Sequence, residues 1–182
     1  MKISYISILL LITLGCGHET TKEDAIKHFI EVYGIYHNDY QSNLVWSKPL
    51  EQVQKDMKNG IIADNSTLTT IQGDIKTGLE THKSSLAKLD KVKSIACKNN
   101  ILEKAKESII GQINTQNDLI SYVELLKGGL AENEIEEFKK LSSRIQTNAD
   151  KIELWRDDLK AYRNEFNFTR EDTKQIIDKF GL

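Results

Sequence analysis

The sequence has one proline and two cysteines, and this scarcity narrows the class of protein. With Pro49 the single proline among 182 residues, long helices are favoured over a loop-rich or all-β domain. Two cysteines cannot build a disulfide framework. Cys97 is therefore interpreted as a buried small hydrophobic residue. The alternative is a redox or intermolecular thiol, but no neighbouring histidine or basic cluster favours a reactive thiolate there.

Long runs of like charge are also missing. The chain carries 25 basic and 27 acidic residues, for a net charge of −2, and the two signs are interspersed. No polybasic segment is present that would bind nucleic acid or an anionic membrane surface. We therefore expect no nucleic-acid partner.

The longest apolar run is too short to cross a membrane. It extends over residues 3–14, after Lys2, and Gly15 and Cys16 follow it directly. A spanning helix needs about 20 apolar residues, whereas a short positive region with a brief apolar stretch is typical of a secretory signal. Residues 1–15 are thus predicted to be a signal peptide.

The position of Cys16 makes this segment similar to the signals of bacterial lipoproteins. In that family a small residue precedes a cysteine, which is lipidated and becomes the new N-terminus. The resemblance implies that an acylated Cys16, carrying palmitate, anchors the protein to a lipid bilayer. This sequence departs from the family pattern because Thr13 occupies the usual leucine position and Leu14 comes one residue later. An ordinary signal peptide and an uncleaved anchor remain alternatives.

The rest of the chain is predicted to be a polar tether over residues 16–23 and one domain over 24–182. Apolar residues at helical spacing predict helices over 24–59, 66–97, 100–127 and 132–164, and a short helix over 170–180. Pro49 is expected to break or kink the first of them. Short connections make consecutive helices antiparallel neighbours. The predicted fold class is all-α, an elongated up-down-up-down four-helix bundle with a short C-terminal helix.

Polar residues interrupt the apolar faces of the predicted helices at similar heights along the bundle axis. The turns near residues 98 and 129 place His82 opposite about position 115, and Gln116 opposite about position 143. His82, Gln116, Ser142 and Ser143 are therefore predicted to share one polar layer. Such a layer could bind a small polar ligand, could fix the register of the helices as a buried asparagine does in coiled coils, or could point partly to solvent.

The first predicted helix carries a distinctive group of aromatic residues. At helical spacing such a group is more often core, but it could also bind a peptide, a glycan or a protein partner. Trp46, beside Pro49, is the member that we expect to be most exposed. The candidate partner surface consists of Trp46, Tyr36 and Tyr40.

The sequence offers no set of residues that would support catalysis or metal binding. The four histidines, His18, His28, His37 and His82, lack the repeated Glu-x-x-His pairs of di-iron bundles. No Gly-x-Ser-x-Gly, His-Glu-x-x-His or glycine-rich phosphate loop occurs. We therefore expect no metal site, no cofactor and no enzyme activity.

Several features of the chain occur together: the Cys16 signal, the tyrosines over 33–40, the long amphipathic helices and the closing Phe166-Asn167-Phe168 segment. This layout resembles small helical surface lipoproteins of unknown function from diderm bacteria. The resemblance implies no catalytic residues, and Gly17 is compatible with outer-membrane sorting as known for lipoproteins of enteric bacteria. We therefore expect a non-catalytic interaction or scaffold protein of the cell envelope, with an envelope protein as a candidate partner. A ligand-binding module with a polar inter-helix site and a periplasmic chaperone-like protein are the alternatives.

Overall fold

The computed structural model describes residues 20–61, 63–129 and 135–180, which are largely helical and contain no strand. The helices are α1 (Lys22–Lys58), α2 (Asn65–Leu89), α3 (Ile101–Gly128), α4 (Ile135–Glu165) and α5 (Arg170–Phe180). The predicted all-α class is confirmed. The predicted signal peptide over residues 1–15, Cys16, residues 17–19 of the tether and the predicted start of the fourth helix at residue 132 lie outside the described residues.

Side chains and a glycine fix where the long helices begin and end. α1, α2 and α3 begin after Thr21, Asp64 and Asn100, and each of these side chains accepts a hydrogen bond from the backbone N–H three residues further on. Such caps satisfy donors that a helix leaves unpaired in its first turn. α3 ends where Gly129 adopts a left-handed conformation with φ of 86°, as glycine commonly does at this position.

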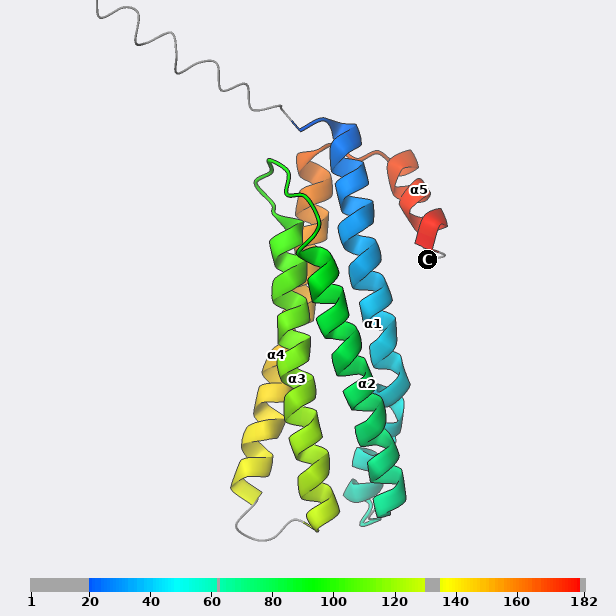
Figure 1. Cartoon of the computed structure of the whole chain (residues 1–182), viewed down its shortest axis with the longest axis vertical. Helices are drawn as coiled ribbons and strands as arrows, with labels where there is room; N and C mark the ends of the chain where they lie inside the picture. The colour runs from blue at the N-terminus through cyan, green and yellow to red at the C-terminus, as the bar shows by residue number, and fades with distance from the viewer. Residues whose placement is uncertain (1–19, 62, 130–134, 181–182) are drawn as a thin grey trace, which may run out of the picture.

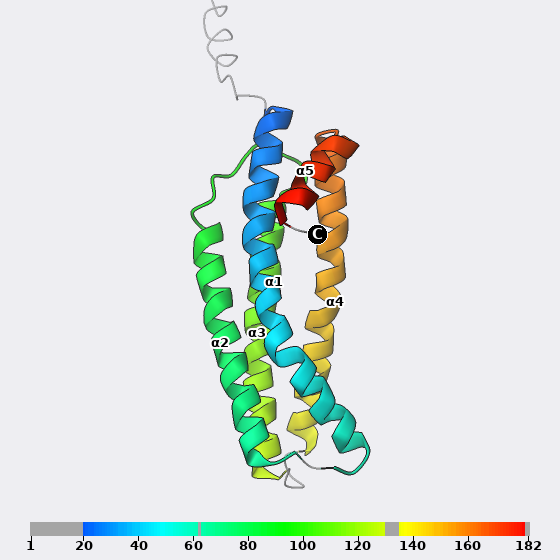
Figure 2. The same ribbon diagram turned by 90° about the vertical axis from the view of Figure 1, so that its right-hand side faces the viewer.

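Pro49 does not break the first helix. α1 continues from Lys22 through Pro49 to Lys58, and Figure 2 shows its second half running at a slant to its first half. A proline inside a helix removes one backbone hydrogen bond and bends the axis. The predicted break is therefore wrong, and the alternative of a kinked helix describes α1.

The second helix is shorter than predicted. α2 ends at Leu89 and Asp90 caps it, so the expected helix up to Cys97 is wrong by about two turns. Val92 is nevertheless buried, and Ile95 packs against the core from a non-helical segment. Glu165 at the end of α4 holds this segment, because its carboxylate accepts the backbone N–H groups of Lys98 at 2.6 Å and Asn99 at 2.9 Å.

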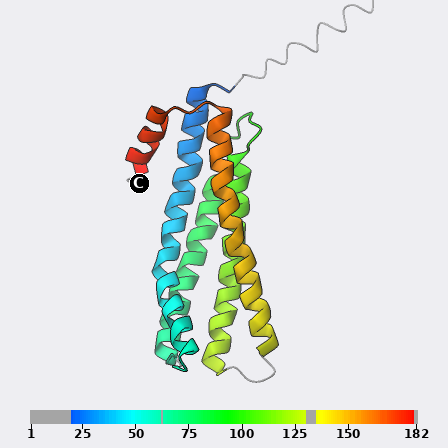
Figure 3. The same ribbon diagram turned by 180° about the vertical axis from the view of Figure 1, so that it is seen from behind.

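The four long helices lie side by side along the long axis of the molecule (Figures 1 and 2). α2 packs against α1 and α3, and α3 packs against α4. α5 folds back along the outside of α1 near the end of the molecule where α1 begins (Figure 3). Aromatic contacts cross the side between α1 and α4, where Phe29 meets Tyr162 and Tyr36 meets Trp155.

The apolar core consists of two parts. The part nearest the start of α1 includes Phe29, Val32, Tyr36, Leu89, Ile101, Ile109, Trp155 and Tyr162. The other part includes Leu50, Val53, Leu68, Ile71, Ile75, Leu119, Val123 and Leu141. Between these two parts, α1, α2 and α3 carry buried polar residues, which include Asp39, His82, Gln112 and Gln116. They form the belt described next.

Candidate binding groove and buried polar belt

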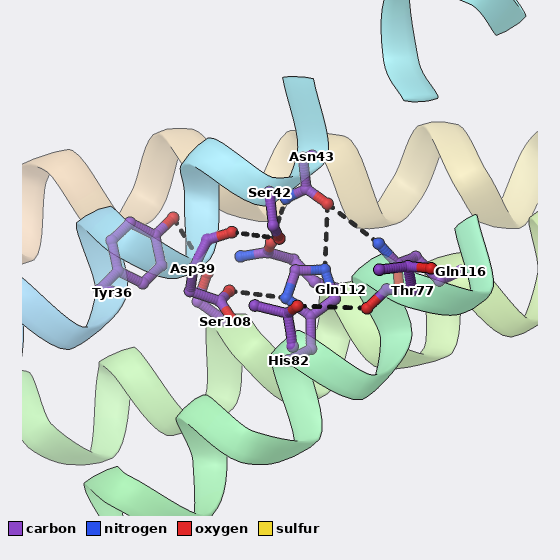
Figure 4. A network of polar contacts seen from close by, with 10 residues as sticks. Tyr36, Asp39, Ser42, Asn43, Thr77, His82, Ser108, Gln112 and Gln116 are labelled. Carbon is purple, nitrogen blue, oxygen red and sulfur yellow. Dashed lines mark hydrogen bonds and ion pairs between the residues drawn. The ribbon is translucent and has the colours of Figure 1, made fainter. Parts of the chain in front are cut away.

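A belt of buried polar side chains lies between the two parts of the apolar core (Figure 4). His82 of α2 is fully buried, as is Asp39 of α1. The ring nitrogen Nδ1 of His82 lies 2.7 Å from Oδ2 of Asp39, and Nε2 lies 3.0 Å from Oδ1 of Asn43. One turn of α1 therefore supplies both partners of the imidazole, because residues 39 and 43 share a helix face.

Asn43 connects His82 to the third helix. Its Oδ1 also accepts a hydrogen bond from Nε2 of Gln116 at 3.0 Å, and its Nδ2 donates to Oε1 of Gln112 at 2.6 Å. Gln116 is fully buried and Gln112 nearly so. The belt thus joins α1, α2 and α3 through the side chain of one asparagine.

Both ring nitrogens of His82 face oxygen atoms, one of the Asp39 carboxylate and one of the Asn43 amide. Buried polar groups need hydrogen-bond partners to offset the cost of desolvation. His82 has such a partner at each ring nitrogen.

Gly78 allows the belt to pack against the backbone of α2. A Cβ atom at Gly78 would lie 2.8 Å from Nε2 of Gln116 and 3.2 Å from Nε1 of Trp46. Only glycine leaves room for both groups at this distance. Gly78 therefore allows the side chain of Gln116 to lie close to the backbone of α2, where Gln116 bonds Asn43.

The belt contains two of the four residues predicted for the polar layer. His82 and Gln116 contact the same oxygen of Asn43. Ser143 is exposed and lies beside a surface hollow with Arg144 and Asp118, which corrects its placement. Leu141 is buried, and a residue two positions away on a helix points about 200° elsewhere. The side chain of Ser142 lies outside the described residues.

Asp39, Asn43 and Gln112 were not predicted as members of the belt. The signal that could have found them is their spacing, since Asp39 and Asn43 are four residues apart, as are Gln112 and Gln116. Residues four apart lie on one helix face.

A groove runs along the surface between α1 and α4 and reaches α5. It consists of two hollows of about 310 Å³ and 230 Å³, which share Tyr33, Arg156 and Leu159 as lining residues. The hollows are therefore neighbouring parts of one groove, which we call the aromatic groove. Volumes of about 300 Å³ and more are typical of small-ligand sites.

Stacked rings form the α1 wall of the aromatic groove. Phe29 and Tyr33 stack at 5.6 Å between ring centroids, and Tyr33 and His37 stack at 5.9 Å. These residues are four apart and so follow one another along the helix. From α5, the edge of the Phe180 ring meets Tyr33 at 5.4 Å.

The opposite wall comes from α4 and is positively charged. Arg156, Leu159 and Arg163 occur at spacings of three and four, which places them on one face of the helix. Arg144 pairs with Asp118 at 2.7 Å, whereas no described residue forms an ion pair with Arg156 or Arg163. The described lining of the groove contains no carboxylate. Burial raises the pKa of Tyr33, and the positive charge of Arg163 opposes this shift.

The three residues of the predicted partner surface lie in different environments. Tyr40 is 39% exposed and lines the aromatic groove. Tyr36 also lines the groove but is buried, with its ring 4.8 Å from that of Trp155. Trp46 is half-buried and packs on the other part of the core, so its predicted exposure is wrong. Trp46 is six positions beyond Tyr40, which turns it about 240° around the helix.

Comparisons with known proteins do not place the chain in a family. No protein-family model, no curated protein and no solved structure matches it. Among the described residues, no group of three or more acidic, histidine or cysteine side chains is arranged to hold a metal ion. No helix in the described part of the chain has the length and apolar character needed to span a membrane.

Proposed function

We propose that this chain is a non-catalytic binding protein of the bacterial cell envelope, which recognises its partner with the aromatic groove. The observation that carries the proposal is the composition of the groove. Aromatic side chains and arginine dominate binding energy in protein recognition sites. Here both line a hollow on the surface, and Tyr40 exposes 39% of its area there.

The proposal includes the membrane anchor implied by the lipoprotein resemblance. Acylated Cys16 would hold the domain on the bilayer, on the outer membrane as the sorting pattern suggests. An envelope protein remains a candidate partner. Because α1 begins at Lys22, residues 16–21 would extend to about 20 Å at most, so the groove would operate close to the membrane surface.

We also propose that the helices form an elongated up-down-up-down four-helix bundle with α5 as a short addition. The support is the packing of each long helix on the next, α1 on α2, α2 on α3 and α3 on α4. In such a bundle the fourth side, between α1 and α4, joins the first and last long helices. This is the side that carries the aromatic groove.

The anchor is tested by metabolic labelling with a fatty-acid analogue and by membrane fractionation. We expect label and membrane association in the wild type and in Cys97→Ala, and neither in Cys16→Ala. Cys97 is the matched control because burial and the nearby Glu165 raise the pKa of its thiol. Equal labelling of wild type and Cys16→Ala would contradict the anchor.

The groove is tested in cells by photo-crosslinking from position 40. A photoreactive phenylalanine analogue at Tyr40 should form adducts, whereas the same analogue at Gly73 should not, because Gly73 is exposed on α2 with open space around it. Adducts from both positions or from neither would contradict the groove as the recognition surface.

A further inference from the structure

We propose that the aromatic groove binds an amphipathic organic anion, a free molecule with a carboxylate or phosphate head and an apolar body. The inference rests on the proposed function, because it names the ligand class of the same groove. It follows from the charges, the unsatisfied donors and the apolar surface that the groove brings together.

The charges in the groove have one sign. Arg156 and Arg163 project from one face of α4 into the two hollows, and the described lining residues include no aspartate or glutamate. The whole chain carries slightly more acidic than basic residues, so a groove without a carboxylate is a local departure from its composition. Guanidinium groups bind carboxylates and phosphates through paired, charge-assisted hydrogen bonds.

Hydrogen-bond donors in the groove lack acceptors. The indole N–H of Trp155 and the Nε of Arg163 are both buried, and neither has a partner among the described residues. Trp155 exposes only 4% of its surface. A buried donor without a partner is costly, and no lining side chain has an unsatisfied buried acceptor. The side chains that carry both donors line the hollows, so a ligand rich in acceptors fits this lining better than a ligand rich in donors.

The rest of the groove is apolar. Phe29, Tyr33 and Leu159 face the hollows from α1 and α4, and Ile176 and Ile177 close the end formed by α5. Ile177 is 39% exposed. Burial of apolar ligand atoms against such surface contributes about 25 cal/mol per Å². The groove therefore offers an anchoring charge beside a surface for a hydrocarbon or aromatic body.

The test uses the full chain in phosphatidylcholine nanodiscs and octanoate as the probe. Trp46→Phe leaves Trp155 as the only tryptophan, so its fluorescence reports on the groove. We expect a saturable change with octanoate and none at equal concentrations of octyltrimethylammonium, which has the same chain with a positive head. Trp155→Phe, which retains Trp46, should give no saturable change.

Substitutions of the arginines identify the head-group site. Arg156→Gln, together with the double variant Arg156→Gln/Arg163→Gln, should weaken octanoate binding by about tenfold or more, the scale of one charge-assisted hydrogen bond. Arg170→Gln is the matched control, because Arg170 is exposed at the start of α5 and does not line the groove. Its octanoate affinity should equal that of the parent protein.

The outcomes separate this inference from the proposed function. Equal binding of octanoate and octyltrimethylammonium would overturn the anion preference. Equal octanoate affinity in the parent protein and the arginine variants would overturn the assigned head-group site. Both results leave the position-40 crosslinks intact. Loss of those crosslinks would instead remove the groove from the proposed function and this inference with it.

Discussion

At the scale of single residues, the buried contact between His82 and Asp39 is the most consequential feature. We predict that Asp39→Asn lowers the free energy of unfolding by about 1–3 kcal/mol. The substitution changes the group that Nδ1 of His82 meets at a fully buried position, and it leaves a polar group there unsatisfied. Urea unfolding at pH 7 measures the change.

The same substitution at Asp157 provides the control. Asp157 is exposed on α4, and surface substitutions usually change stability by less than about 0.5 kcal/mol. Asp157→Asn should therefore unfold like the wild type. If Asp39→Asn and Asp157→Asn have equal effects, the buried pair contributes no stability, and the belt has another role.

Two glycines of α2 make a matched pair for a second prediction. Gly78→Ala adds a methyl group 2.8 Å from Nε2 of Gln116, and such overpacking typically costs about 1–3 kcal/mol. The gain in helix propensity of about 1 kcal/mol offsets part of this cost. Gly73 has nothing within 4 Å of the added atom, so Gly73→Ala should gain up to about 1 kcal/mol.

Thermal or urea unfolding of both variants measures this contrast. The prediction is the opposite sign of the two effects rather than the size of either. An increase in stability for Gly78→Ala as large as that for Gly73→Ala would show that Gln116 moves away at no cost. The close contact between α2 and the belt would then not be important for stability.

At the scale of helices, the start of α5 depends on Asp172. Its carboxylate accepts the backbone N–H of Thr169 at 2.6 Å, and the Thr169 hydroxyl accepts the N–H of Asp172 at 3.2 Å. The ion pair with Lys22 and these hydrogen bonds to Thr169 lower the pKa of Asp172 to about 2. The same carboxylate thus caps α5 and ties it to the first turn of α1.

The depressed pKa of Asp172 predicts how α5 responds to acid. A carboxylate whose pKa in the folded protein lies below its ordinary value of 3.8 stabilises the folded state at pH values above 3.8. This contribution is lost as the pH falls through about 2. We expect Asp172→Asn to increase amide hydrogen exchange in α5 at pH 7. The difference from the wild type should shrink between pH 4 and pH 2.

Asp178→Asn is the control for this experiment. Asp178 lies on the same helix and is exposed, but it is near the C-terminal end, where a negative charge is unfavourable for the helix dipole. Its removal should leave exchange in α5 unchanged or slightly slower. Equal acceleration in both variants would mean that any loss of negative charge loosens α5.

Helices with strong local signals could be predicted from the sequence, whereas features set by tertiary contacts could not. Thr21 and Gly129 are local signals, and α1 begins and α3 ends beside them. The helix predicted through residue 97 ends at Leu89 because Glu165, 67 residues beyond Lys98, binds the segment that follows. Apolar spacing alone cannot distinguish Val92 in a helix from Val92 packed in a loop.

The residues of the candidate sites also divide into those that the sequence predicts and those that depend on tertiary contacts. His82 and Gln116 were predicted together because turn positions and helical rise fix their heights along the axis. Asp39 and Asn43 were missed because the bend and the rotation of α1 decide which of its faces meets α2. The groove could not be predicted, since it requires the lateral distance between α1 and α4 and the placement of α5.

At the scale of the whole molecule, a polar belt separates two apolar cores. Apolar packing alone tolerates sliding of one helix past another, whereas Asn43 can bond both His82 and Gln116 at one register only. Buried polar residues fix register in this way in coiled coils. The belt thereby also fixes the height of the α1 rings relative to α3, and α4 with its arginines packs on α3.

The stability of the whole molecule should fall in mild acid because of His28. His28 is 5% exposed, with its ring 6.2 Å from that of Tyr162 in the first core. Burial lowers its pKa, and the negative charge of Glu31 opposes this shift more weakly. The unfolded chain therefore binds this proton more readily than the folded protein, so the contribution of neutral His28 to stability is present above about pH 6.5 and is lost below it.

His28→Gln isolates this contribution, because glutamine has no charge to gain. Urea midpoints at pH 7.5 and 5.5 should fall further for the wild type than for His28→Gln, with equal m-values showing that the same surface unfolds. The other titrating groups are common to both proteins and cancel in the comparison. Parallel losses of stability would mean that burial in the first core does not disfavour protonation of His28.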